Sequence, residues 1–180
     1  VVEQLQGASF PASILERDVL KARLPGYRPE DLDTLQAAGE VVWVGQGALG
    51  ERDGRLALFL ADSLPYLLGP RPEPVKGALH DRIREHLARE GASFFGEIHA
   101  AASGTLADSV VEALWDLAWA GEVTNDTPSA LRAYLASRSR HSSQKRLSGF
   151  RSRRQVPPAA VGRRRRDRTH REVSRGARAA

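Results

Sequence analysis

The 180-residue chain is 41% hydrophobic, has a formal net charge of +5, and contains neither cysteine nor methionine. This length supports one compact domain or two small ones, and the lack of cysteine excludes disulfides and thiolate metal sites. Because the chain has no long apolar run and no basic-then-apolar leader, we expect a cytoplasmic protein with no membrane partner.

Residues 1–69 are the first predicted module, and they begin with helical patterns. Phe10 and Ile14 share one face of a helix, with Pro11 in its first turn. A second helix opens at residues 28–32, where acidic side chains lie near the positive end of the helix dipole. These patterns place helical structure ahead of the first strand.

A two-stranded hairpin is predicted after these helices. Gly39 is a suitable residue to end the second helix, because glycine readily takes the left-handed conformation. Residues 41–44 and 55–60 have the composition of strands, and Asp53 and Gly54 form a strong turn signal just before the second one. Helices followed by a hairpin are typical of a winged helix, in which the hairpin is the wing.

A linker and a second module are predicted next. Residues 70–76 form a stiff, proline-containing linker, and residues 77–136 form the second module. Within it, apolar residues at helical spacing predict three helices, which cover 79–90, begin at 94, and cover 106–120. Residues 121–124 begin a strand, but no long hairpin follows, so we expect a short second wing. A last helix is expected at 130–135.

Two sequence blocks occur twice in the same order. Gly-Ala-Ser-Phe occurs at 7–10 and 91–94, and Leu-x-x-Leu-x-x-x-Gly-Glu-Val occurs at 32–41 and 114–123. Two matching blocks in one order indicate a duplicated structural unit. The predicted fold is therefore mainly α with short β-hairpins (α+β), built from two tandem winged-helix modules and a disordered basic tail.

No motif in the chain predicts a catalytic, nucleotide or metal site. Gly45, Gly47 and Gly50 match a dinucleotide-binding spacing, but that mechanism needs a following helix, and here the sequence continues into another strand. The chain has no phosphate-binding loop ending in Lys-Ser or Lys-Thr, and its histidines lack metal-ligand spacing. We therefore expect no catalytic residue, no metal and no cofactor in this segment.

The charge of the predicted helices disfavours direct reading of DNA bases. A winged helix usually places basic side chains of its last helix in the major groove. Here that helix of the first module carries Glu30, Asp31 and Asp33, and its counterpart at 106–120 has no Lys or Arg. Because negative charge repels phosphate, we expect these helices to serve packing. The expected nucleic-acid contacts of the first module are Arg28, Arg52 and Arg55.

The charge of the chain is divided between an acidic body and a basic tail. Residues 137–180 carry 15 Lys or Arg against 2 acidic residues, whereas the preceding residues carry 12 against 20. Because it has few apolar residues, we expect this tail to be disordered in isolation and to bind nucleic acid without sequence preference. Its expected contact residues are Arg138, Arg140, Lys145, Arg146, Arg151, Arg153 and Arg154.

Four stretches resemble the C-terminal part of the large helicase-related (Lhr) family of bacteria. They are Ile-Leu-Glu-Arg-Asp-Val-Leu at 14–20 with Pro-Gly-Tyr at 25–27, Gly-Glu-Val-Val-Trp-Val-Gly at 39–45, Asp-Gly-Arg at 53–55, and the segment from Ala113 to Thr127. The resemblance covers about residues 4–158. Because the chain has no methionine and opens in mid-pattern, we expect it to be a piece of a longer protein.

The resemblance implies that the intact protein is a superfamily 2, ATP-dependent DNA helicase that acts in DNA repair, with ATP and Mg²⁺ bound by motor domains outside this segment. It also implies DNA and the remaining helicase domains as partners, oligomers formed through winged-helix surfaces, and a bacterial, nucleoid-associated location. The segment alone would be a non-catalytic scaffold. The alternative is a free-standing winged-helix module for DNA binding or assembly.

The resemblance changes near Gly162. The family continues a Pro-Pro-Ala-Ala-x-Gly-Arg segment, like the one at 157–163, into the strands of a β-barrel, whereas this sequence continues into a run of arginines. A change of reading frame near Gly162 and an authentic basic tail both account for the difference. The family's C-terminal extension is similar to a group of bacterial DNA glycosylases, but the resemblance transfers no glycosylase catalytic residue to this chain, because the barrel sequence that would supply it is missing.

Overall fold

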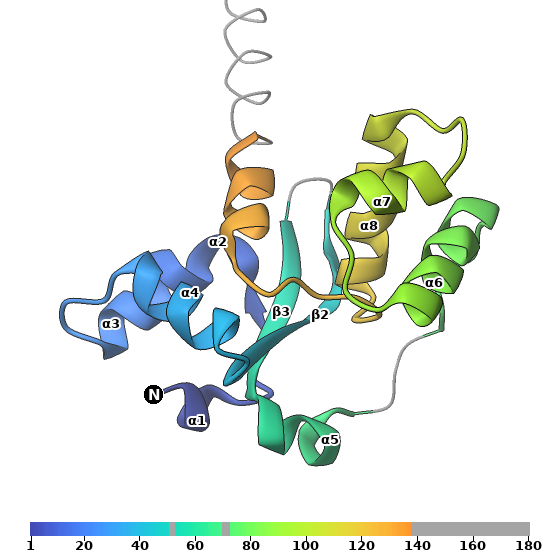
Figure 1. The fold of residues 1–180 in the computed structure, drawn as a ribbon. Helices are drawn as coiled ribbons and strands as arrows, with labels where there is room; N and C mark the ends of the chain where they lie inside the picture. Colours follow the sequence, from blue (N-terminus) through green and yellow to red (C-terminus); the bar gives the residue numbers. More distant parts are fainter. Residues whose placement is uncertain (51–52, 70–72, 138–180) are drawn as a thin grey trace, which may run out of the picture.

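The computed structural model describes residues 1–50, 53–69 and 73–137. It combines helices with a three-stranded antiparallel sheet, which confirms the mixed class of helices and a hairpin. In Figure 1 the sheet lies between the helices of the first half of the chain and a second group formed by α6, α7 and α8. Within the described ranges, no helix is long and apolar enough to cross a membrane. The predicted tail after residue 137 lies outside these ranges.

The helices of the first half are short. They are α1 (Val2–Leu5), α2 (Ala12–Ile14), a π-helical segment (Leu15–Leu20), α3 (Lys21–Arg23) and α4 (Pro29–Ala37). Pro29 begins α4, and the backbone N–H of Arg28 donates a 2.9 Å hydrogen bond to the carboxylate of Asp31. Gly39 follows this helix with a φ of +73°, which confirms the predicted left-handed helix end.

The sheet has the strand order β1–β3–β2. Its strands are β1 (Phe10–Pro11), β2 (Val41–Leu49) and β3 (Asp53–Leu60). β2 and β3 form the predicted long hairpin, in which Val41 lies opposite Leu60. The register of the hairpin shifts between Gly45 and Ala48. The glycines with dinucleotide-like spacing thus belong to β2 and the turn after it, as predicted.

Two local predictions near this sheet were wrong. Phe10 and Pro11 form β1 instead of a helical turn, because they pair with β3 at the edge of the sheet. Asp53 and Gly54 open β3 instead of forming a turn. The Asp53 carboxylate accepts hydrogen bonds from the backbone N–H and the hydroxyl of Ser13, at 3.2 Å and 2.6 Å. Asp53 therefore joins the hairpin to α2.

The second half of the chain contains the predicted helices but not the predicted strand. After a 3-10 turn at Ala61–Ser63 come α5 (Leu64–Leu67), α6 (Ala78–Glu90), α7 (Phe95–Ala101), α8 (Ala107–Trp119) and a final described helix at 129–137. Residues 121–124 form no strand in the structure, so the strand predicted there was wrong, while the second winged-helix module stays a prediction. The expected boundaries at 70–76 and 136 stay predictions.

Both halves of the chain share the main hydrophobic core. Trp43, Leu56 and Leu58 of the hairpin pack with Trp119 of α8 and Leu131 of the final helix. The indole rings of Trp43 and Trp119 lie 6.2 Å apart. A separate cluster holds α6, α7 and α8 together, and its members include Ile83, Ile98, Val110 and Leu117. Burial of these apolar side chains is the main force that joins the halves.

Two glycines of the hairpin allow α8 to approach closely. A Cβ atom on Gly45 would overlap the carbonyl oxygen of Ala118, and a Cβ on Gly54 would overlap the indole ring of Trp119. The end of α8 therefore contacts the backbone of the hairpin directly. Gly121, which follows α8, also lies against Gly45.

Candidate nucleic-acid interface

α4 is the helix that a winged helix would present to DNA, and its charged face is acidic and partly covered. Of the residues of α4, Leu32 and Gln36 are buried, whereas Glu30 and Asp31 are exposed. Asp33, on the same helix, contacts Arg132 of the final helix. α4 therefore directs no cation from its middle turns toward solvent, which supports packing over base contact.

Arg132 connects the final helix to two elements of the first half. Its guanidinium donates to both carboxylate oxygens of Glu16, at 2.7 Å and 2.8 Å, and to Asp33 at 2.8 Å. It also donates to the carbonyl oxygen of Pro29 at 3.1 Å. The hydrogen bonds that Arg132 donates to Glu16 raise the pKa of Arg132 above its usual range, so this charge is permanent. The planar N–H donors of the guanidinium are matched by acceptors on both sides, an arrangement that is typical of a structural ion pair.

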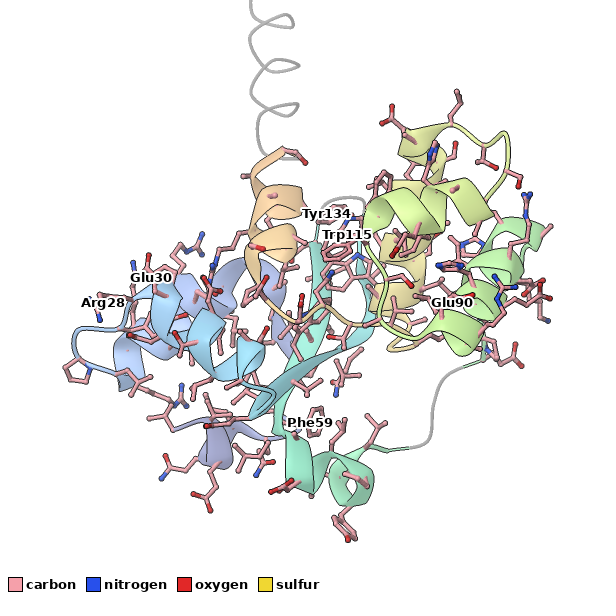
Figure 2. All side chains as sticks on the ribbon, viewed as in Figure 1. Arg28, Glu30, Phe59, Glu90, Trp115 and Tyr134 are labelled. Atoms are coloured by element: carbon pink, nitrogen blue, oxygen red, sulfur yellow. The ribbon has the colours of Figure 1, made fainter. Side chains whose placement is uncertain are left out.

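Arg28 is an exposed cation at the start of α4. Its guanidinium lies 3.5 Å from Asp31, and its side chain is 75% exposed. Figure 2 shows Arg28 at the outer edge of the molecule, beside Glu30. An exposed pair of this kind is easily exchanged for a contact with phosphate, since it contributes little to stability. Arg28 thus stays a candidate contact residue, although the carboxylates of Glu30 and Asp31 lie close to it.

The other predicted contact residues are separate from Arg28. Arg55 is exposed on β3, opposite Pro11, and among the described residues no ion pair involves it. Arg28 and Arg55 lie on different elements, and no hydrogen bond or ion pair within the described ranges joins them. Arg52 and the seven predicted contacts from Arg138 to Arg154 lie outside the described residues.

Two cations that the sequence reasoning did not select are exposed on α3. Lys21 and Arg23 lie in this short helix, one loop before Arg28. No ion pair within the described residues involves either side chain. Their i, i+2 spacing before the Pro25-Gly26 break was the signal that could have found them. Together with Arg28, and with Arg17, which pairs with Asp18, they are exposed cations at the helical end of the first half.

α8, the counterpart of α4, is also acidic on its exposed face. Asp108, Glu112 and Asp116 are exposed, and Asp116 lies 3.3 Å from the imidazole of His80. These carboxylates face solvent where a DNA-reading helix would carry cations. Neither α4 nor α8 contains a Lys or Arg, and the expectation that both helices serve packing stays a prediction.

A second arginine cluster fixes the end of the linker. Arg84 of α6 donates to both carboxylate oxygens of Glu122 and to the backbone carbonyl of Val75. The backbone N–H of Val75 in turn donates to Glu122 at 3.0 Å. Chiefly through the hydrogen bond from Arg84, the pKa of Glu122 falls below its usual value. Both charged clusters, at Arg84 and at Arg132, therefore hold elements of the fold together.

Comparison with known proteins identifies the family. A family model described as the winged-helix domain of the large helicase-related protein matches residues 1–61. The "Lhr helicase/ probable uracil glycosylase" of Mycolicibacterium smegmatis is 42% identical over 137 residues, which cover 76% of this chain and 9% of the relative. The "Lhr helicase/uracil glycosylase" of Escherichia coli K12 is 39% identical over 161 residues, which cover 86% of this chain and 10% of the relative.

The chain spans about a tenth of the length of these curated relatives. The matched winged-helix domain covers α1 to the end of the β2–β3 hairpin, and this confirms a winged helix in the first predicted module. The chain belongs to the large helicase-related family.

Proposed function

We propose that this segment of a large helicase-related protein is part of the C-terminal winged-helix region of an ATP-dependent DNA helicase that acts in DNA repair. The segment is non-catalytic on its own and serves as a scaffold that also contacts nucleic acid. ATP and Mg²⁺ bind to the motor domains elsewhere in the intact protein. The names of the two relatives support the helicase, and the ion-paired state of the described charged clusters supports a scaffold.

The observation that carries the scaffold role is the contact of Arg132 with Glu16 and Asp33. It packs the final helix against the helices of the first half and engages the face of α4 that holds Asp33. A helix that reads DNA must leave its side chains free for base edges. In α4, by contrast, the charged side chain of Asp33 is engaged in an intramolecular ion pair with Arg132.

Nucleic-acid contact is assigned to the exposed cations and to the basic tail. Arg28, Arg52 and Arg55 belong to the first module, and seven further cations lie between 138 and 154. Because no helix with basic side chains is available to contact base edges, the binding is non-specific, and its affinity falls steeply as the salt concentration rises. DNA and the other domains of the helicase are the proposed partners, and the bacterial cytoplasm with its nucleoid is the proposed location.

Measurement of ATP hydrolysis tests the non-catalytic role. The purified chain should show no ATPase activity above that of a buffer control, with or without single-stranded DNA. The intact relative serves as the positive control under the same conditions. DNA-stimulated ATP turnover by the chain alone would contradict the proposal.

A salt series tests which cations bind DNA. In one full-length variant, the seven cations between 138 and 154 are replaced by Gln. In a matched control variant, all seven are Lys, which keeps the charge. The Gln variant should lose up to about 0.7 to 0.9 units of salt slope for each phosphate contact removed, and the Lys variant should keep the slope of the native chain. The arginines after Gly162 remain in both variants, so they contribute equally.

The same assay compares the body with the tail. Replacement of Arg28, Arg52 and Arg55 by Gln should reduce the salt slope less than replacement of the tail cations, because the body contacts are fewer. An unchanged slope in both Gln variants would remove nucleic-acid contact from the proposal, while the scaffold role would still be judged by the ATPase assay and by stability.

A further inference from the structure

A large groove lies between α7, α8 and the final helix. Its volume is about 770 Å³, within the range of 300–1,000 Å³ that is usual for ligand sites. Phe95, Ile98, Val111, Leu114 and Trp115 line it on one side, and residues of the final helix line the other. Trp115 of α8 contacts Tyr134 of the final helix, with ring centroids 4.3 Å apart. The two labelled side chains lie next to each other in Figure 2.

Large apolar side chains remain exposed at this groove. Phe94 is 84% exposed, Phe95 is 43% exposed and Val111 is 38% exposed, and all three line the groove. Neighbouring exposed side chains of this size mark an interaction surface, whereas single ones are common on any protein. The exposure of Phe94 has a local cause, because its counterpart Phe10 pairs with β3, whereas residues 73–137 contain no strand beside which Phe94 could pair.

The charge around the groove selects the kind of occupant. No Lys or Arg is among the residues that line it, whereas Asp126 is. Asp108 and Glu112 are exposed on α8 on either side of Val111 in the sequence. An apolar floor with an acidic border repels phosphate and favours a segment that combines apolar side chains with cations.

Such a segment follows the groove in the sequence. Ser137 lines the groove, and the residues after it carry seven cations by position 154, with Leu147 and Phe150 among them. The ten residue steps from Ser137 to Leu147 span up to about 35 Å when extended, which is ample to return to the groove. A tethered segment of this kind acts at a high effective concentration.

We propose that residues 145–156 of this chain bind in the groove, with Leu147 and Phe150 against its apolar floor and the neighbouring arginines against its acidic border. The groove is thus an intramolecular docking site for a cationic, apolar segment. Binding of the segment covers Phe94 and Phe95 and withdraws its cations from solvent. The contact needs no nucleic acid, so its test is independent of the proposed DNA binding.

Disulfide trapping in the full-length chain tests this contact, because the native sequence has no cysteine. One variant carries Ala92→Cys, at the groove, and Ser148→Cys, in the segment. The control variant carries Ala22→Cys, exposed on α3 and away from the groove lining, with the same Ser148→Cys. Under mild oxidation the groove pair should cross-link about tenfold faster than the control pair.

A second substitution separates docking from random encounters. Leu147→Ala with Phe150→Ala, added to the groove pair, should lower its rate to that of the control pair. Ser142→Ala with Ser143→Ala, in the same tail, should leave the rate unchanged. Asp126→Asn with Glu112→Gln should slow cross-linking at low salt and have little effect at high salt. Equal rates for the two cysteine pairs, or a rate insensitive to the loss of Leu147 and Phe150, would overturn the proposal.

Discussion

The two copies of Leu-x-x-Leu-x-x-x-Gly-Glu-Val end their helices in the same way and then differ. In the first copy, the N–H groups of Gly39 and Glu40 donate to Gln36 and Leu35 at 2.9 Å and 3.0 Å. In the second, Gly121 and Glu122 donate to Ala118 and Leu117 at 3.0 Å and 2.9 Å. Both glycines have a φ of +73°. The helix end is therefore encoded locally, and the repeat preserves it.

The copies diverge at the next residue. Val41 begins β2, since the apolar run that follows it can be buried in the sheet. Val123 is followed by polar residues and forms no strand. Instead, the hydroxyl of Thr124 donates to the carbonyl oxygen of Trp43 at 2.7 Å. The segment after the second copy thus packs against the hairpin of the first copy. A helix end alone does not produce a wing, because the residues that follow it must also be apolar enough to be buried in a sheet.

The Gly-Ala-Ser-Phe block shows the same divergence. Phe10 lies in β1, pairs with Leu56 and packs against the main core. Phe94 precedes α7 and is almost fully exposed. The same residue type in the same local sequence is buried only where a strand is available beside it.

The largest expected effect comes from closing the space between the hairpin and α8. Gly45→Ala should lower the free energy of unfolding by about 3 kcal/mol, because the new Cβ overlaps the backbone of Ala118. Urea denaturation followed by tryptophan fluorescence measures this loss. Gly96→Ala is the control, since nothing lies within 4 Å of a Cβ on this residue of α7, and alanine favours helix. Equal losses in both variants would show that the halves do not pack through Gly45.

The next effect tests why the final helix lies against the first half. Arg132→Ala should lower the free energy of unfolding by about 2 kcal/mol, because it leaves the carboxylates of Glu16 and Asp33 without their cation. This is less than for a fully buried pair, since the side chains keep part of their solvent contact. Arg132→Lys keeps the charge but loses the bidentate fork, so it should lose about half as much. If Arg132→Ala unfolds at the native urea concentration, the cluster does not stabilise this contact.

A smaller effect compares the two phenylalanines directly. Phe10→Ala should lower the free energy of unfolding by between about 1 and 2 kcal/mol, because Phe10 is only partly buried against the core. In the variant that also carries Leu147→Ala and Phe150→Ala, in which the proposed docking is lost, Phe94→Ala should change it by less than about 0.5 kcal/mol in the same urea assay, since Phe94 is then exposed. With the native tail, Phe94→Ala should cost more, because the proposed docking of residues 145–156 covers this side chain; equal losses for Phe10→Ala and Phe94→Ala in the undocked variant would contradict the comparison.

Local patterns in the sequence predicted most of the elements but not how they pack. The periodic apolar residues of α6 and α8 and the run that begins at Val41 are local signals, and the structure confirms all three. The contact of Gly45 with Ala118 joins residues far apart in the chain, so no local pattern reveals it. The polar residues after Val123 were visible in the sequence, but the contact of Thr124 with the hairpin depends on the fold.

The candidate interface was predictable in charge but not in arrangement. The acidic residues of α4 and α8 were visible in the sequence, and the structure leaves most of them exposed, while their unsuitability for phosphate stays a prediction. Arg132 was not selected, because a single arginine in a short helix has no distinctive pattern. Its role depends on Glu16 and Asp33, which reach it only through the fold. An ion pair between residues far apart in the chain cannot be predicted from the local sequence around either residue.

The smallest effect concerns the two glutamates of the repeat. Glu122 accepts from Arg84 and Val75, whereas Glu40 is exposed and, within the described residues, makes no ion pair. Glu122→Gln should lower the free energy of unfolding by about 1 kcal/mol at pH 7, and Glu40→Gln should have no measurable effect. The lowered pKa of Glu122 fixes the pH dependence. A depressed carboxyl pKa stabilises the fold above the ordinary glutamate value of about 4.3, and this stabilisation disappears as the pH falls through the lower folded value. The two glutamine variants should therefore differ at pH 7 and converge in acid; a gap that persists in acid would assign the loss to packing instead of charge.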